Sequence, residues 1–261
     1  MTEQPDRYFF VHIMKTAGTA LRQRLVNHFG RDAVYPTRDL DGTDLIRGYI
    51  SVDHLRERLE ARGDQIQVIA GHFPLRTVEL IEGPYTTLTL LRDPVERMLS
   101  YLRRGGGRGA FELALGERSE EDRLPRSMSF EEIYDAHLGR ADNTMTKMLT
   151  LTPAEMSASM LTRVDMRRDH LERAKEALAD IDAVGLQEHL EDFCEELATR
   201  FGWQLGELKV VNTTTPVEIP ESLRARIVED NAIDVELYEF ARQLVGTRDD
   251  RAGPEAAGVR Q

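Results

Sequence analysis

Cysteine and long apolar runs are both scarce in this sequence, and each shortage excludes a class of protein. The single Cys194 cannot form an internal disulfide, and its helical pattern, "LEDFCEELATRF", indicates a buried side chain without chemistry. No run of about 18 apolar residues occurs, so we expect no integral membrane association. The first residues lack the basic and then apolar pattern of a secretory signal, which predicts a cytoplasmic location.

Positive charge is also in short supply. The 261 residues include 34 Lys and Arg against 46 Asp and Glu, which gives a formal net charge of −12. Nonspecific binding to nucleic acid needs a basic surface, so we expect no nucleic-acid partner, and an anionic ligand would need a local basic pocket. The balance of 41% hydrophobic and 31% charged residues is typical of a folded globular chain.

Three short β-rich segments, each followed by a helical pattern, organise the first hundred residues. The segments are 8–13, 66–73 and 85–92. The last ends where Pro94 removes a backbone donor and opens a helix with Val95, Met98 and Leu99 on one side. Repeated strand-to-helix transitions predict βαβ units and a parallel sheet.

The second half reads as a helical insertion followed by a return to the sheet. We expect the insertion at about 105–182, with a loop over 105–126 and a capping-box start at Ser129. Strands are expected at 183–186 and 208–212, and a helix at 231–245. Residues 1–246 would then form one domain, and 247–261 a disordered tail.

The stretch "HIMKTAGTAL" follows the first predicted strand and suits an anion. Small Ala17 and Gly18 would let the ligand approach the helix N-terminus, Thr16 and Thr19 would donate hydroxyls, and Lys15 would add a charge. The glycine and lysine spacing is not that of an ATP-binding P-loop, so ATP hydrolysis is not supported. An ordinary strand-to-helix turn explains this segment alone equally well.

A second anion site is suggested by "LLRDPVERMLSYL". Arg92 ends the third strand and can grip a phosphate, and Ser100 lies further along the next helix, where it can donate. The alternative is an ion pair between Arg92 and Asp93, with Ser100 on the helix surface. Two such sites after neighbouring strands imply a ligand with two separated anionic groups.

Together the two motifs resemble the signatures of sulfotransferases that use 3′-phosphoadenosine 5′-phosphosulfate (PAPS), in the branch of carbohydrate 2-O-sulfotransferases and their bacterial relatives. The resemblance extends to about residue 244 and implies a P-loop-like three-layer α/β sandwich. It assigns the 3′-phosphate to Arg92 and Ser100. It assigns the 5′-phosphosulfate to the first loop, which comprises Lys15, Thr16, Ala17, Gly18, Thr19 and Ala20. Met14 departs from the proline usual before the lysine.

A general base is predicted in "AGHFPLR", at the end of the second strand. His72 stands beside Gly71 where parallel sheets place ligands, and histidine is the commonest base for an acceptor hydroxyl. The resemblance also implies that a "GH" histidine serves as this base. A packing histidine in a tight turn is the alternative. Lys15 would assist catalysis by neutralising the sulfonate, so no metal is expected. The other histidines do not have the spacing of metal ligands, and we interpret His12 as a core residue.

The acceptor is the least determined part of the prediction. Asn143, Thr146 and Lys147 would line its cleft, and the polar face of a lid helix explains them equally well. The predicted reaction transfers a sulfuryl group from PAPS to a hydroxyl of a small-molecule, lipid or saccharide acceptor and releases adenosine 3′,5′-bisphosphate. Transfer to an amine is the second choice. A nucleotide-binding protein without catalysis and a nucleotide-dependent kinase remain as alternatives.

Overall fold

The core of the protein is a parallel sheet of five strands. The computed structural model describes residues 7–37, 40–41, 45–103, 129–156, 164–207 and 219–252. Within these ranges the strand order is β2-β3-β1-β4-β5, and every neighbouring pair is parallel. The strands are β1 (Tyr8–Val11), β2 (Val34–Tyr35), β3 (Val68–Ile69), β4 (Thr86–Leu91) and β5 (Ala183–Leu186). The predicted α/β class is therefore confirmed.

Helices follow or connect the strands throughout the described part of the chain. The first half has α1 (Gly18–Phe29), α2 (Leu45–Ile50), α3 (Val52–Arg62), the 3₁₀ helix η1 (Leu75–Leu80) and α4 (Pro94–Arg103). The second half has α6 (Phe130–His137), α7 (Thr144–Thr150), α8 (Pro153–Met156), α9 (Arg168–Asp180), η3 (Gln187–His189), α10 (Leu190–Phe201), α11 (Glu221–Asp230) and α12 (Ala232–Ala252).

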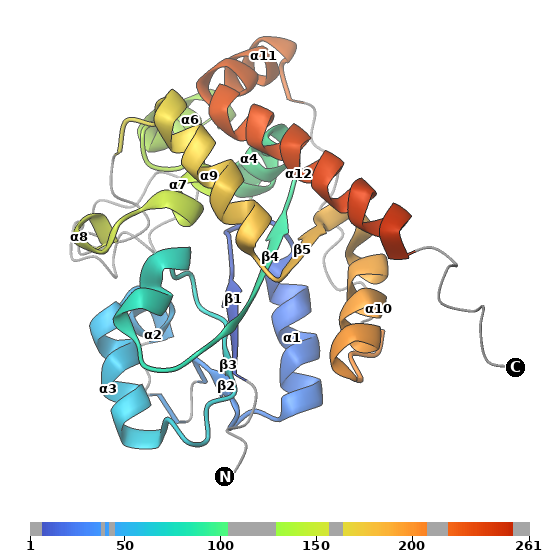
Figure 1. Ribbon diagram of the computed structural model, residues 1–261. Helices are drawn as coiled ribbons and strands as arrows, with labels where there is room; N and C mark the ends of the chain where they lie inside the picture. The colour runs from blue at the N-terminus through green and yellow to red at the C-terminus, as the bar shows by residue number, and fades with distance from the viewer. Residues whose placement is uncertain are drawn as a thin grey trace, which may run out of the picture.

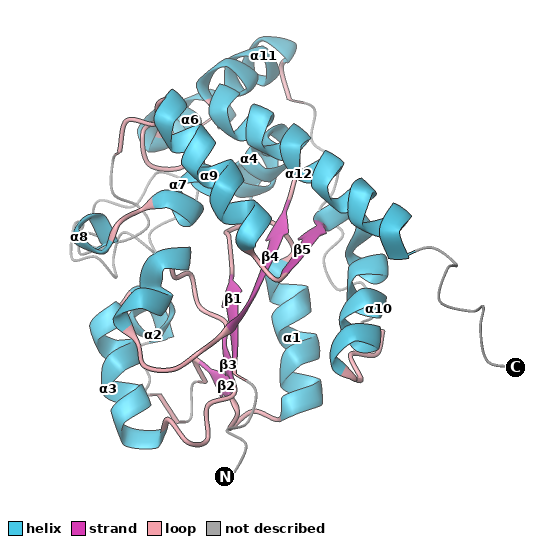
Figure 2. Cartoon of the chain, in the orientation of Figure 1, coloured by secondary structure: helices cyan, strands magenta, loops and turns pink. Residues whose placement is uncertain are grey.

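The sheet is buried on both faces, which explains why its strands read as nearly continuous apolar runs. Along β1, Phe9 and Val11 belong to one core cluster, whereas Tyr8 and Phe10 belong to the other. The first cluster includes residues of α3, α7, α9 and α12, and the second includes residues of α1 and α10. Figure 2 shows the strands between α2 and α3 on one side and α1 and α10 on the other.

Local sequence signals set several helix ends as predicted. The Ser51 side chain accepts a hydrogen bond from the His54 backbone N–H and so caps α3, which ends before Gly63. Ser129 and Glu132 form the predicted capping box of α6. Arrowheads of β1 and β4 in Figure 1 point towards the end of the sheet where α4, α6, α9 and α11 gather.

Some elements depart from the prediction. Strand β2 and helices α2 and α11 had no clear signal, because no longer apolar run surrounds β2, α2 is short, and the hydrophobic pattern of α11 is weak. Helix α12 continues to Ala252, into the stretch that was expected to be disordered from residue 247. The predicted strand at 208–212 and the predicted loop at 105–126 lie outside the described residues.

Candidate functional site

The candidate site lies where three neighbouring strands end. Strands β3, β1 and β4 are adjacent and parallel, so their carboxyl ends meet at one edge of the sheet. His72 follows β3, the loop at 12–17 follows β1, and Arg92 follows β4. The His72 Nδ1 atom lies 2.6 Å from the His12 carbonyl oxygen, and an Arg92 guanidinium nitrogen donates to the Lys15 carbonyl at 3.3 Å. The structure thus brings these three predicted sites together.

The loop after β1 has an unusual backbone. Lys15 and Ala17 adopt left-handed φ angles of 70° and 66°, and they are two of the three non-glycine residues with positive φ that the structure describes. Such conformations are strained and often occur at ligand sites. Thr16 is fully buried, and its hydroxyl donates to the Ile13 carbonyl at 2.9 Å. In this structure the hydroxyl therefore bonds within the loop, and its contact with a ligand stays a prediction.

The loop leads into the N-terminus of α1, which has no side-chain cap. Ala17 is the N-cap and makes no side-chain capping bond, and the first turn has no acidic residue. The first N–H groups of a helix have no partner within the helix, so this end attracts an anion. Thr19 is exposed in this first turn, whereas Lys15 and Ala20 are partly buried.

Gly18 opens α1 in close contact with a buried ring. A Cβ atom at this position would lie 2.0 Å from Cδ2 of His12 and 2.3 Å from its Nε2. Glycine is therefore required here by the imidazole behind it, in addition to any ligand in front.

Arg92 lies between β4 and α4, and Ser100 lies within α4. Arg92 is partly buried, and its Nε atom finds no hydrogen-bond partner among the described residues. The pKa of Arg92 is lowered, chiefly by burial. Glu96 and Asp93 oppose this lowering, and Arg103 adds to it. Asp93 accepts a hydrogen bond from the Glu96 N–H and caps α4, so the alternative reading as a simple Arg92–Asp93 pair does not describe its main role. Ser100 is partly buried on α4.

His72 is held in a neutral, oriented state. Its pKa is lowered to about 4, chiefly by burial and also by Arg22, against a hydrogen bond to the His12 backbone that raises it. A carbonyl oxygen can only accept, so Nδ1 of His72 carries the proton and Nε2 carries the lone pair. The backbone N–H of His72 donates to the Tyr49 carbonyl at 2.7 Å. A neutral imidazole with the proton on Nδ1 presents the Nε2 lone pair that a general base needs, and its lowered pKa makes it a weaker base than an unperturbed histidine.

Three residues near His72 were not identified as site residues from the sequence. The His12 and His72 rings are 4.3 Å apart between centroids, and the Tyr49 and His72 rings are 5.6 Å apart. The Arg22 guanidinium lies 5.5 Å from the Tyr49 ring centre and also donates to the Pro36 carbonyl. Arg22 is one turn after Gly18 on α1, and this spacing was the only available signal for it.

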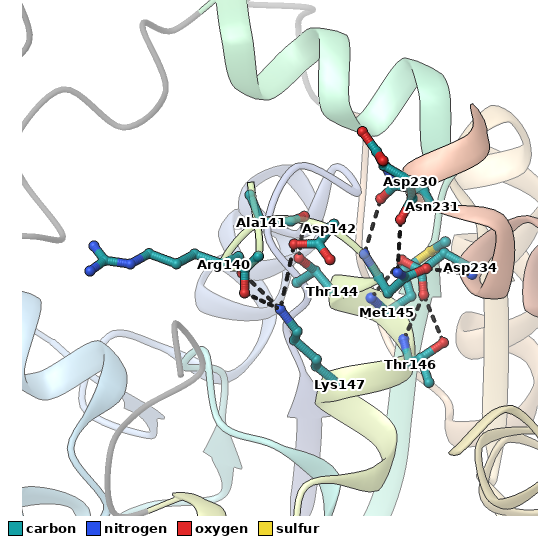
Figure 3. Close-up of polar contacts among 12 residues, drawn as sticks. Arg140, Ala141, Asp142, Thr144, Met145, Thr146, Lys147, Asp230, Asn231 and Asp234 are labelled. Carbon is teal, nitrogen blue, oxygen red and sulfur yellow. Dashed lines mark hydrogen bonds and ion pairs between the residues drawn. The ribbon is translucent and has the colours of Figure 1, made fainter. Parts of the chain in front are cut away.

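The residues predicted to line the acceptor cleft make hydrogen bonds within the protein, and Figure 3 shows those of Thr146 and Lys147. The Asn143 side chain donates to the Asp230 carbonyl and accepts from the Asp234 N–H, at 2.9 and 3.1 Å. Both the N–H and the hydroxyl of Thr146 donate to the Asp234 carboxylate at 2.8 Å. This pattern favours a structural role for both residues.

Lys147 belongs to the same buried network. Its side chain is fully buried, and its ammonium donates at 3.2 Å to the carbonyl oxygens of Gly139 and Arg140. Burial lowers the pKa of Lys147, while Asp142, 3.9 Å from the ammonium, raises it. The contacts of Lys147 in this structure are internal, and a polar face of a lid helix does not describe a fully buried ammonium; its role towards an acceptor stays a prediction.

Two further properties bear on the class of site. Among the residues that the structure describes, no group of three or more His, Cys, Asp or Glu side chains is arranged to hold a metal ion. No helix within the described ranges has the length and apolar character needed to span a bilayer.

Comparison with known proteins gives one informative similarity. No family model matches the sequence. The chain is 27% identical over 177 residues to the heparan-sulfate 6-O-sulfotransferase 3-B of Danio rerio. The match covers 60% of this chain and 42% of that relative, so the chain spans less than half of the relative's length. This distant similarity is to a sulfotransferase, as the motifs predicted, but it does not point to the 2-O branch.

Proposed function

We propose that this protein is a sulfotransferase that moves a sulfuryl group from PAPS to a hydroxyl of a small-molecule, lipid or saccharide acceptor. The observation that carries the proposal is the meeting of His72, the loop with Lys15, and Arg92 at the ends of three adjacent strands. The similarity to a sulfotransferase supports it independently.

The residues present fit a ligand with two anionic groups. At one position, the uncapped N-terminus of α1 would hold the 5′-phosphosulfate together with Lys15 and the backbone N–H groups of the loop. At the other, Arg92 has a buried Nε atom without a partner among the described residues, and with Ser100 it would hold the 3′-phosphate. Bound PAPS would supply the electrophilic sulfur and a stable leaving group, adenosine 3′,5′-bisphosphate.

The protein's own contribution is to orient the acceptor and to move its proton. Nε2 of His72 accepts the proton of the acceptor hydroxyl as the oxygen bonds to sulfur. The other proton stays on Nδ1, hydrogen-bonded to the His12 carbonyl oxygen, and that hydrogen bond strengthens as the imidazole becomes charged. Lys15 and the helix end stabilise negative charge on the departing oxygen.

Binding of adenosine 3′,5′-bisphosphate is the first test. At about 100 times its Kd the ligand should stabilise the wild type by roughly 2.7 kcal/mol in thermal unfolding, and Mg-ATP and adenosine 5′-phosphate should not. Arg92→Ala should weaken binding by roughly 10- to 100-fold, since it removes a charge-assisted contact. Arg242→Ala, an exposed arginine on α12, is the matched control.

The outcomes separate the alternatives. Stabilisation by Mg-ATP alone would indicate a kinase and would refute the proposal, as would no stabilisation by any nucleotide. Bisphosphate binding without turnover on any acceptor would indicate a binding protein of the same fold. His72→Ala should abolish turnover and leave bisphosphate affinity nearly unchanged.

Acceptors can be screened in a defined order. The name of the relative makes heparan sulfate the first acceptor to assay with labelled PAPS, followed by neutral saccharides, hydroxylated lipids and small alcohols. Product analysis distinguishes the 2-O position, to which the motif resemblance points, from the 6-O position in the relative's name. It also separates transfer to oxygen from transfer to nitrogen.

A further inference from the structure

The side chain of His12 fills the space between the proposed base and the proposed nucleotide loop. It is 4% exposed, and its ring lies 4.3 Å from the His72 ring at an interplanar angle of 45°. On the other side it stacks on Phe10, with centroids 5.2 Å apart and planes 10° from parallel. Its position just past β1 thus makes it a spacer between the ends of β1 and β3.

The contact with Gly18 joins the same ring to the nucleotide loop. A methyl group on Gly18 would meet the imidazole at 2.0 Å, so the ring occupies the space that any side chain at this loop position would need. The main chain of His12 also contacts His72, since the His12 carbonyl oxygen accepts a hydrogen bond from Nδ1–H of His72. One residue therefore touches both halves of the proposed site.

Packing alone does not explain a histidine at this position. Its Nδ1 atom is buried and finds no hydrogen-bond partner among the described residues. A buried polar atom left unsatisfied costs on the order of 1–3 kcal/mol, which an aromatic hydrocarbon of similar shape would avoid. The Ala70 backbone, on the strand end that leads to His72, raises the pKa of His12, whereas burial lowers it by more.

We propose that His12 is a positioning residue that sets the distance and orientation of His72 relative to the nucleotide loop. This inference deepens the proposed function and rests on it for its catalytic meaning. Groups near His72 include His12 itself, Arg22 from α1 and Tyr49 from α2. The ring of His12 also lies against Gly18 of the loop.

The first experiment reads His72 directly, by NMR titration of the histidines in the full chain without ligand. In His12→Ala, water would reach the space beside His72, so the midpoint of His72 should rise from about 4 towards 6.5. His12→Phe keeps an aromatic ring at this position and removes both imidazole nitrogens, and it serves as the second variant if the alanine variant folds poorly. His170→Ala, a buried histidine on α9, is the matched control and should leave the midpoint in place.

The second experiment measures turnover. His12→Ala should lower kcat by roughly 10- to 100-fold, because a base displaced by about 1 Å loses that much. Its Kd for adenosine 3′,5′-bisphosphate should change much less. Gly18→Ala should also lower kcat in the wild-type background and should have little further effect beside His12→Ala, since the clash is then gone.

The two experiments distinguish failure of the positioning role of His12 from failure of the proposed function. An unchanged His72 midpoint in both His12→Ala and His12→Phe would overturn the positioning role, whether or not the protein transfers sulfuryl groups. Additive effects of His12→Ala and Gly18→Ala on kcat would overturn it as well. Absence of nucleotide binding and of turnover in the wild type would refute the proposed function, and the NMR titration would still report on the contact between the two histidines.

Discussion

Replacing His72 by asparagine should make the protein less sensitive to acid. The side-chain N–H of asparagine can replace Nδ1 as donor to the His12 carbonyl, so the substitution removes the titrating group and keeps the hydrogen bond. Histidine in the unfolded chain titrates near 6.5, whereas burial holds the folded pKa of His72 at about 4. Between these values the unfolded chain binds a proton that the folded chain does not.

The sign and size of the effect follow from this difference. His72 adds stability that is fully present above pH 6.5 and is lost as the pH falls towards 4. The full loss corresponds to roughly 3 kcal/mol, because each pKa unit is worth about 1.4 kcal/mol. The pKa of His12 is also lowered, chiefly by burial, so His12 acts in the same direction and remains in the variant.

The assay is urea unfolding at pH 7.5 and pH 4.5, followed by circular dichroism. The wild type should lose roughly 2–3 kcal/mol more than His72→Asn between the two conditions. The surface variant His189→Asn should follow the wild type, because it leaves both buried histidines in place. If His72→Asn and the wild type lose equal stability, His72 is not held neutral by burial, and the reasoning fails.

Three further predictions concern stability and can be checked by urea or thermal unfolding. Asp234→Ala leaves several buried donors of α7 without their acceptor and should cost roughly 3–5 kcal/mol of folding stability. The control Glu236→Ala, also on α12, removes an exposed ion pair with Arg168 and should cost less than about 1 kcal/mol. Equal losses would contradict the role of the buried network. Gly185→Ala should cost roughly 1–3 kcal/mol, since its Cβ would lie 2.4 Å from the ring of Phe193, and a neutral result would mean that the ring moves freely. Ser129→Ala removes the cap of α6 and should cost about 1 kcal/mol; no loss would mean that the capping box is not formed in solution.

Local chemistry explains the elements that could be predicted. Apolar runs followed by helical periodicity identified β1, β3, β4 and the helices after them, and Ser51 and Ser129 identified helix starts. These signals act over a few residues, through hydrogen bonds to the adjacent backbone and through burial of one face. Strand β2 was not predicted because no longer apolar run surrounds Val34–Tyr35, whereas β3, equally short, lies within the apolar stretch 66–73. Helix α11 was not predicted because its hydrophobic pattern is weak.

Within the site, the sequence by itself determined which loops follow which strands, because parallel strands place their following loops at one edge of the sheet. It thereby predicted that His72, the loop with Lys15, and Arg92 would meet. Only the tertiary structure decided how polar side chains far apart in sequence would pair. Thr146 bonds to Asp234 from α12, and His12 packs between His72 and Gly18. Local periodicity does not reveal such contacts, because a threonine that bonds within the protein and one that faces a ligand can occupy the same position in a helical pattern.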